Sequence, residues 1–312
     1  MNWHCELSTS SKARLLLVLL TFAWGLSWPT MKIALDEVGF WGLRVIGLSI
    51  SAASFFLWIS LRGRSFNIPR GRPRIHVFVS SLFNIVGFSF FASLAQLSAT
   101  TSRVVIINYS MPIWGSLMAW LILGERLNLL SGIGLLLCIA GLSVLVYPVV
   151  VTESPVGLLL AHGCMLCWAA GTVYMKWARI PGDMVAITGW QIAIGAVAMI
   201  IGYFAFHGMS LPALAPISWH AVLAVIYNGL IGTGLAYLLW FAIIERLPTA
   251  TASLGTLANP VIGIIFSVIL LGERPTLPDI IGFALIFAAA ACVLIPQRDR
   301  TSTTTRSLVN PR

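Results

Sequence analysis

Two short segments of the chain combine aromatic rings with a lysine at helical spacing. In the first, Trp24, Trp28 and Lys32 lie at positions i, i+4 and i+8, which places all three on one face of a helix. A second such segment begins at Trp168 and ends at Lys176. An aromatic face beside a positive charge suits a ligand with an apolar body and a carboxylate. The alternative is an aromatic belt at a membrane surface, with each lysine extended toward the lipid headgroups.

Other polar or helix-breaking residues interrupt long apolar runs. Arg44 lies about four or five residues inside such a run, where an arginine needs a cavity or, as an interfacial anchor, water or a lipid phosphate. Pro112 and Pro260 each remove a backbone hydrogen bond near the middle of a run. These breaks either improve packing or open a ligand site. The candidate cavity residues are Trp24, Trp28, Lys32, Arg44, Asn108, Tyr109, Pro112, Trp114, Trp168, Gln191, Tyr237, Trp240, Asn259 and Pro260.

These residues lie in a chain that is too apolar for an ordinary soluble domain. Of the 312 residues, 58% are hydrophobic and 9% are charged. Apolar runs of roughly 18 to 25 residues can each cross a ~30 Å hydrocarbon layer as a helix. We expect ten spans, at residues 15–35, 40–61, 76–98, 104–123, 129–150, 156–177, 185–206, 220–243, 250–271 and 278–295. The first could imitate a signal peptide, but it lacks an evident small-residue cleavage site, and the loops are too short for an added soluble catalytic domain.

The basic residues gather on one predicted side of the membrane. With the N-terminus in the cytoplasm, that side holds fifteen lysines and arginines and the other side holds two, with Lys32 and Arg44 near outer helix ends. The positive-inside rule therefore places both termini in the cytoplasm. The same distribution accounts for the net charge of +9 without a nucleic-acid partner. We expect a multi-pass protein of the cell membrane, most naturally a bacterial inner membrane.

An internal repeat is the strongest signal in the sequence. Residues 24–32 read WGLSWPTMK and residues 168–176 read WAAGTVYMK, so Trp, Met and Lys recur at an offset of 144 residues. Asn84 and Asn228 share this offset. Pro112 and the Gly-Glu-Arg triplet at 124–126 recur at an offset of 148 residues, as Pro260 and the triplet at 272–274. Arg44 has Gln191 as its approximate counterpart.

The repeat divides the chain into a cytoplasmic segment 1–14, a first half 15–150, a second half 156–296 and a cytoplasmic tail 297–312. Each half holds five spans, and an odd number makes the second half enter the membrane from the opposite face. The expected fold is therefore all-α, with ten transmembrane helices as two inverted five-helix repeats around a central cavity. Inverted repeats are typical of alternating-access proteins with a midplane site. A duplicated membrane anchor is the alternative.

No catalytic, metal or cofactor site is predicted. Inversion places Glu125 and Glu273 of the two Gly-Glu-Arg triplets at opposite edges of the membrane, so we expect gate or helix-end contacts. Cys164 and Cys167 form a C-x-x-C that could carry electrons, but no second cysteine pair exists to receive the disulfide. All ten Asp and Glu residues fall at helix ends, loops or tails, and only His162 falls within a span. A membrane thiol oxidoreductase or other intramembrane enzyme is the alternative from a different class.

The lead-helix pattern at Trp24 and Trp168, and the proline followed by Gly-Glu-Arg in the fourth and ninth helices, resemble the EamA-type drug/metabolite transporters. The resemblance covers about residues 15–295. Within that superfamily, the length and the Trp-rich helices are similar to the bacterial aromatic amino-acid exporters of the YddG type. The resemblance implies ten helices around a central cavity and outward movement of amino acids or related metabolites. Nucleotide-sugar and triose-phosphate carriers share the wider fold.

We therefore predict a transporter that exports small organic metabolites, chiefly amino acids with aromatic or bulky apolar side chains, by alternating access. A nucleotide-sugar or drug transporter of the same fold is the alternative. The expected partners are a small-molecule substrate and the lipid bilayer, and the expected state is a monomer. Because no carboxylate lies near the predicted midplane, we expect downhill transport rather than proton coupling.

Overall fold

The computed structural model describes residues 9–124, 129–152, 155–207, 216–244 and 259–294, and within these ranges every regular element is a helix. The helices of the first half are α1 (Thr9–Leu61), α2 (Arg72–Ser81), η1 (Leu82–Gly87), α3 (Phe88–Ser98), α4 (Thr101–Asn108), α5 (Met111–Leu123) and α6 (Leu129–Thr152). Those of the second half are α7 (Val156–Ala178), α8 (Met184–His207), α9 (Trp219–Ile226), η2 (Tyr227–Leu235), α10 (Ala236–Ile244), α12 (Asn259–Leu271) and α13 (Leu277–Leu294). The elements η1 and η2 are π-helices.

Each expected span overlaps one or more of these helices. Among the residues that the structure describes, six helical stretches are long and apolar enough to cross a membrane, and three shorter apolar helices accompany them. The longest, Leu15–Leu61, contains the first two expected spans, because α1 is two helices joined at Gly39. Gly39 has a φ of 66°, a conformation that favours glycine, and this single residue breaks the helix without a loop. The protein is thus a multi-pass membrane protein whose described ranges hold helices alone as regular elements, while ten crossings stay a prediction.

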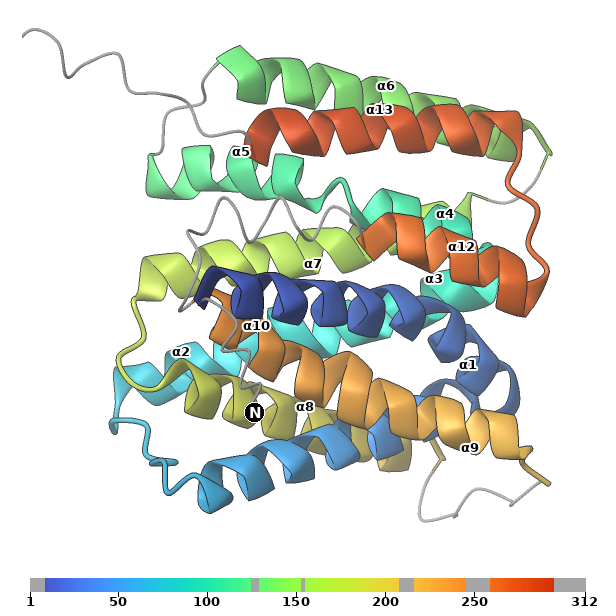
Figure 1. Ribbon diagram of the computed structural model, residues 1–312. Helices are drawn as coiled ribbons and strands as arrows, with labels where there is room; N and C mark the ends of the chain where they lie inside the picture. Colours follow the sequence, from blue (N-terminus) through green and yellow to red (C-terminus); the bar gives the residue numbers. More distant parts are fainter. Residues whose placement is uncertain (1–8, 125–128, 153–154, 208–215, 245–258, 295–312) are drawn as a thin grey trace, which may run out of the picture.

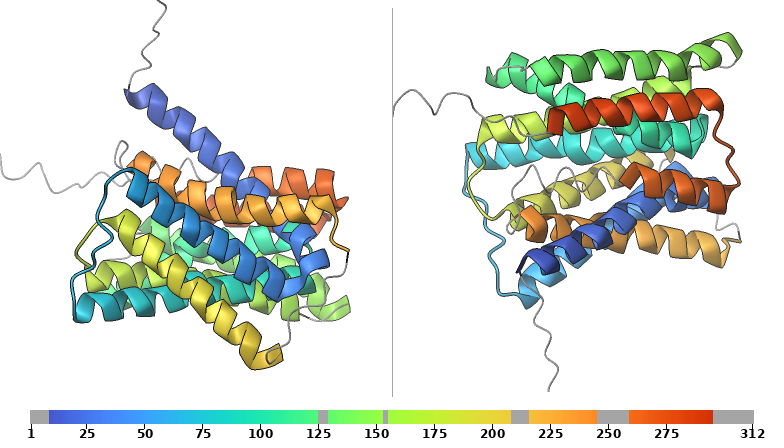
Figure 2. Two further views of the ribbon diagram at one scale, coloured as in Figure 1. Left: turned by 90° about the horizontal axis from the view of Figure 1, so that it is seen from below. Right: turned by 45° about the horizontal axis from the view of Figure 1, so that its top comes forward.

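The helices lie side by side in one bundle. In Figures 1 and 2, α6 and α13 pair at one edge, and the second half of α1 lies with α8 at the opposite edge. Between these edges lie α3, α7, α10 and the first half of α1. We call the end of the bundle where α1 turns the Gly39 end, and the end where α7 terminates at Arg179 the Arg179 end.

The two halves share matched helices and matched π-helices. The helices α1 and α7 contain the matched Trp-Met-Lys segments and run in opposite directions through the bundle (Figure 1). Each lies against a π-helix of the other half, α1 against η2 and α7 against η1. The matched Asn84 and Asn228 fall in these two π-helices. A π-turn is rare and frequently marks a functional site. The π-helices at equivalent places in both halves therefore indicate that a functional site lies near η1 and η2.

The outer surface of the bundle is apolar. Leu57, Ile75, Leu136 and Ile201 each expose 60% or more of their area, and they belong to four different helices. Exposed apolar side chains on this scale need a nonpolar surrounding, which the hydrocarbon layer of a bilayer supplies. The surface thus agrees with the membrane location indicated by the length and composition of the helices.

Candidate functional site

A chain of aromatic rings runs through the middle of the bundle, and we call it the aromatic chain. It consists of Trp28, Phe88, Trp168, Tyr237, Trp24 and Trp240, in that order of contact. The centroids of successive rings are 6.5, 5.0, 6.0, 6.3 and 6.0 Å apart. These distances lie within the range of favourable aromatic pairs. The rings come from α1, α3, α7 and α10, so both halves of the protein contribute.

Tyr237 lies between the two tryptophans that the repeat matches. Its ring contacts Trp24 on α1 and Trp168 on α7. Because both rings contact Tyr237, Trp24 and Trp168 lie at a similar depth in the bundle, although α1 and α7 run in opposite directions. The side chains of all three residues keep part of their surface accessible, although they face the interior. The centre of the bundle therefore offers accessible aromatic surface.

Arg44 and Gln191 occupy equivalent places on the two sides of this centre. The Arg44 guanidinium donates from Nη2 to Met31 Sδ at 2.9 Å, and Gln191 donates from Nε2 to Met175 Sδ at 3.3 Å. Met31 and Met175 are matched by the repeat, at the offset of 144 residues that also relates Trp24 to Trp168. The two polar side chains thus have corresponding partners, as their proposed equivalence requires.

Each of these polar groups has a further partner on the first-half helix beside it. Arg44 Nε donates to Ser93 Oγ on α3 at 2.5 Å, and Gln191 Nε2 donates to Ser80 Oγ on α2 at 2.7 Å. Ser93 lies toward the Gly39 end of the bundle and Ser80 toward the Arg179 end. The centre is therefore flanked by a cation on one side and by a neutral amide on the other.

The fourth expected span is interrupted immediately before Pro112. Its first part, α4, ends at Asn108, and α5 begins at Met111. Asn108 accepts a hydrogen bond from the Cys164 thiol of α7 at 3.3 Å, and Tyr109 lies against Asn259 at the start of α12. The structure thereby brings Asn108, Tyr109 and Asn259 together across the two halves. Trp114 lies on α5, where its indole Nε1 is buried without a partner in the described residues.

The matched Pro260 is buried in the first turn of α12. Residues 245–258 before it are outside the described ranges, and so is Glu125 of the first Gly-Glu-Arg triplet. The prediction that Pro260 interrupts its helix as Pro112 does, and the prediction of a gate contact at Glu125, stay open.

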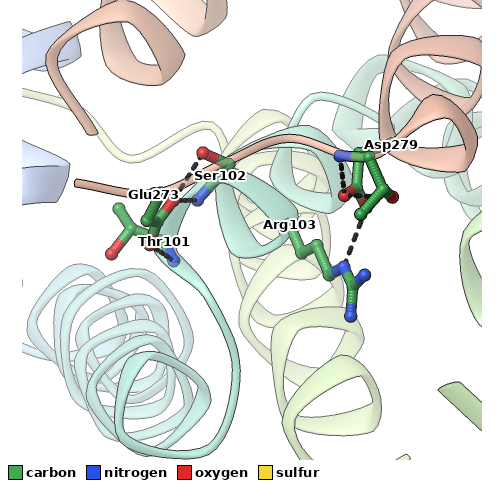
Figure 3. Close-up of polar contacts among 6 residues, drawn as sticks. Thr101, Ser102, Arg103, Glu273 and Asp279 are labelled. Carbon is green, nitrogen blue, oxygen red and sulfur yellow. Dashed lines mark hydrogen bonds and ion pairs between the residues drawn. The ribbon is translucent and has the colours of Figure 1, made fainter. Parts of the chain in front are cut away.

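Glu273 of the second triplet joins the two halves at the Gly39 end. Its carboxylate accepts hydrogen bonds from the backbone N–H of Thr101 at 2.5 Å and of Ser102 at 2.9 Å, and from Ser102 Oγ at 2.5 Å (Figure 3). It therefore satisfies the free N–H groups at the start of α4, where a negative charge is also favoured by the helix dipole. Beside it, Arg103 Nε lies 2.8 Å from Asp279 Oδ1 in an ion pair that also joins the two halves (Figure 3).

Two small pockets flank Glu273. One has a volume of about 180 Å³ and is lined by Ser98, Arg103 and Glu273 among others. The other has a volume of about 370 Å³ and is lined by Lys32, Gln96 and Glu273 among others. Lys32 is thus at the Gly39 end, where it lines the second pocket and pairs with Asp36 at 2.6 Å. These pockets lie outside the aromatic chain, and the central cavity remains a prediction.

Three parts of this arrangement were missed from the sequence. Phe88 links Trp28 to Trp168 in the aromatic chain. The repeat gives no signal for it, because residue 232 at the same offset is a glycine. Ser93 is likewise one of many serines in apolar helices. Met31 and Met175 carry a signal, since both fall within the matched segments, although the predicted site includes only the tryptophans and Lys32 of those segments.

The apolar surface, the helical bundle and the two matched halves are typical of a membrane transporter. Comparison with known proteins agrees. The EamA-like transporter family matches twice, at residues 11–147 and 155–295. The chain belongs to the EamA-like transporter family. The two matches coincide closely with the halves expected from the repeat.

Similar proteins are named as transporters or as members of related groups. The chain is 24% identical to the uncharacterized transporter YoaV of Bacillus subtilis, over 88% of this chain and 94% of that protein. It is 26% identical to the uncharacterized inner membrane transporter YedA of Escherichia coli, over 89% of each. It is 27% identical to a chloroplastic WAT1-related protein of Arabidopsis thaliana, over 86% of this chain and 67% of that protein. One crystal structure, at 24% identity and a TM-score of 0.60, has the same fold over 88% of this chain and 95% of its own.

Proposed function

We propose that this transporter exports amino acids with aromatic or other bulky apolar side chains by alternating access. The observation that carries the proposal is the aromatic chain, because it combines rings from both halves at the centre of the bundle. Rings that move with different halves can hold an apolar body in one arrangement and release it in another. Aromatic faces also bind apolar groups through a large area at little cost in side-chain entropy.

The charges near the centre favour a zwitterion or an anion over a cation. Arg44 lies on one side of the aromatic chain, and an organic cation would be repelled by it. The five carboxylates in the described ranges all lie at helix ends or in loops. A multidrug carrier for cations would need a negative group near the rings, and the described residues provide none there.

The same distribution supports downhill transport. A proton-coupled carrier generally needs a titratable group that proton and substrate occupy in turn. His162 is the histidine within α7. Its ring Nδ1 is already hydrogen-bonded to the Leu158 carbonyl of its own helix, at 2.8 Å, so this nitrogen is not open to a substrate. We propose that the substrate gradient alone drives transport, from a monomer in a bacterial inner membrane with both termini in the cytoplasm.

The test is flux of radiolabelled amino acids through proteoliposomes that contain the purified protein. We expect saturable flux of tryptophan and phenylalanine, and weaker flux of alanine and of glutamate. Tyr237→Ala should raise the half-saturating tryptophan concentration about tenfold, since loss of one or two aromatic contacts costs about 1.4 kcal/mol. The matched control is Trp120→Ala, because Trp120 is 46% exposed on α5 and contacts none of the rings in the aromatic chain.

A panel without saturable flux of any amino acid would contradict the proposal and direct the search to nucleotide sugars and drugs. A tenfold effect of Trp120→Ala would show instead that loss of any tryptophan impairs the protein. An imposed pH gradient should not produce uphill accumulation of tryptophan. Accumulation that a protonophore abolishes would contradict the downhill mechanism while leaving the substrate class intact.

A further inference from the structure

The Arg44 guanidinium points into the bundle and not toward the lipid. Its partners are Ser93 on α3, which is fully buried, and Met31 on the first half of α1, which is 6% exposed. It also lies near the buried thiol of Cys164 on α7. A side chain held among three helices in this way cannot act as an interfacial anchor. Arg44 is therefore an interior cation.

The charge of Arg44 has no opposite charge beside it in the described residues. Its two hydrogen-bond acceptors are a hydroxyl and a thioether, and neither is anionic. Each carboxylate in the described ranges has a different partner. Asp36 pairs with Lys32, Glu37 accepts from Ser218, Asp183 pairs with Arg64, Glu273 caps α4, and Asp279 pairs with Arg103. Burial of an unpaired cation is costly, and an anionic ligand would relieve that cost.

The equivalent place in the second half carries no charge. Gln191 makes the same kind of contact to Met175 that Arg44 makes to Met31, but with a neutral amide. The matched architecture therefore differs at its two sides in one property, the charge. Packing does not explain the difference, because both side chains bond a methionine and a serine. A ligand with one anionic end would distinguish the two sides.

The aromatic chain reaches the turn next to Arg44. Trp28 precedes Met31 by three residues on α1, and Phe88 precedes Ser93 by five residues on α3, so both rings lie about one helical turn from the partners of Arg44. Trp24, at the depth of Tyr237, is seven residues from Met31, which is about 10 Å along the helix axis. This length is comparable to that of an amino acid with a large aromatic side chain.

We propose that Arg44 binds the carboxylate of the substrate, with the apolar body extended along the aromatic chain toward Tyr237. The inference rests on the proposed function and adds the orientation and a chemical requirement: the substrate needs a carboxylate, and the same molecule without one is rejected. Arginine suits this role because its planar guanidinium presents several donors to a carboxylate, and Ser93 and Met31 fix its orientation. Lys32 is not equivalent, because Asp36 already neutralises it.

The experiment compares phenylalanine with phenylalaninamide, which has the same ring and ammonium group but no carboxylate. Both are tested as competitors of radiolabelled tryptophan flux, with full-length protein in proteoliposomes. For the native protein, we expect phenylalanine to compete at a concentration at least tenfold lower than phenylalaninamide. Arg44→Gln installs the side chain of the second half, and it should reduce tryptophan flux at low concentration at least tenfold and make the two competitors equal.

Two further variants keep the test decisive. Arg64→Gln makes the same chemical change at a partly exposed arginine of the Arg179 end, and it should retain both flux and discrimination. Arg44→Lys keeps the charge and should retain the preference for phenylalanine with weaker competition, and it replaces Arg44→Gln as the test if that variant does not fold.

The outcomes separate the two proposals. If the native protein transports tryptophan and Arg44→Gln discriminates as the native protein does, the carboxylate role of Arg44 is wrong and the proposed function stands. A loss of the preference for phenylalanine in a folded Arg44→Lys protein would also overturn the role, because charge would then not be the deciding property. If the native protein moves no amino acid at all, the proposed function itself fails.

Discussion

Substitution of Glu273 by glutamine should open the Gly39 end of the bundle. In the native protein, two carboxylate oxygens accept three hydrogen bonds from Thr101 and Ser102 at the start of α4. A glutamine side chain has only one acceptor oxygen, so at least one backbone N–H loses its partner. That loss costs about 1–3 kcal/mol, and loss of the charge at the helix N-terminus adds about 0.3–1 kcal/mol. A total of about 2 kcal/mol corresponds to a roughly 30-fold shift between closed and open arrangements.

The assay measures how fast a buried thiol at position 105 reacts. Val105 is fully buried on α4, one turn beyond the Glu273 contact, and it packs against α12 at Gly263. In a protein with Val105→Cys and its five native cysteines replaced by alanine, we expect Glu273→Gln to speed modification by a small thiol reagent about 30-fold. The matched control is Asp36→Asn at the same end, since Asp36 pairs with Lys32 of its own helix, and it should change the rate less than twofold.

An unchanged rate in the Glu273→Gln protein would refute the reasoning, because the hydrogen bonds across the halves would then not hold this end closed. Equal acceleration by Asp36→Asn would refute it in another way, by showing that any loss of negative charge there has the same effect. Two further hydrogen bonds connect the start of α4, where Glu273 binds, to the aromatic chain. Thr101 Oγ1 donates to Gln96 Oε1 at 3.4 Å, and Gln96 Nε2 donates to the Trp28 carbonyl at 3.1 Å. Opening should therefore also alter tryptophan fluorescence.

Further predictions concern packing and topology. Gly171→Ala should lower the thermal unfolding midpoint by several degrees, because a Cβ there would overlap the side chain of Asn84 in η1, whereas Gly115→Ala, with open space at its Cβ position, should not. A thermal scan of the two purified variants checks this, and equal midpoints would contradict the packing argument. A cysteine at position 70 should react with an impermeant reagent only after permeabilisation, and one at position 153 should react in intact cells. External labelling at position 70 would invert the predicted orientation.

The sequence predicted those parts of the fold that depend on composition and repetition. Runs of apolar residues located the helices, because length and hydropathy suffice to identify a membrane span. The repeat also selected Trp24 and Trp168, and the structure brings both to Tyr237. The approximate equivalence of Arg44 and Gln191 could also be inferred from the sequence, since it needs only an alignment of the two halves.

What could not be predicted depends on how helices rotate against each other. The sequence placed Lys32 both on the stripe of Trp24 and Trp28 and near a helix end, and only the structure shows that its ammonium group pairs with Asp36. Phe88 joins the aromatic chain because η1 precedes it, and a π-turn changes the direction of every later side chain on that helix. The order of residues 82–87 does not by itself signal a π-turn, although η1 packs against α7 and α8 in the structure.

The turn at Gly39 has a mechanical consequence. The first half of α1 carries Trp24, Trp28 and Met31, and the second half carries Arg44, with one glycine and no loop between the two helices. A connection this short has no slack, so a displacement of one helix must either pull the other along or change the backbone angles of Gly39 itself. Whatever movement releases the substrate, Trp24, Trp28 and Arg44 stay connected through the same turn at Gly39, on the two helices that meet there. The part of the site on α1 therefore moves as two rigid helices joined at Gly39, and the distance of each site residue from Gly39 along its helix is fixed.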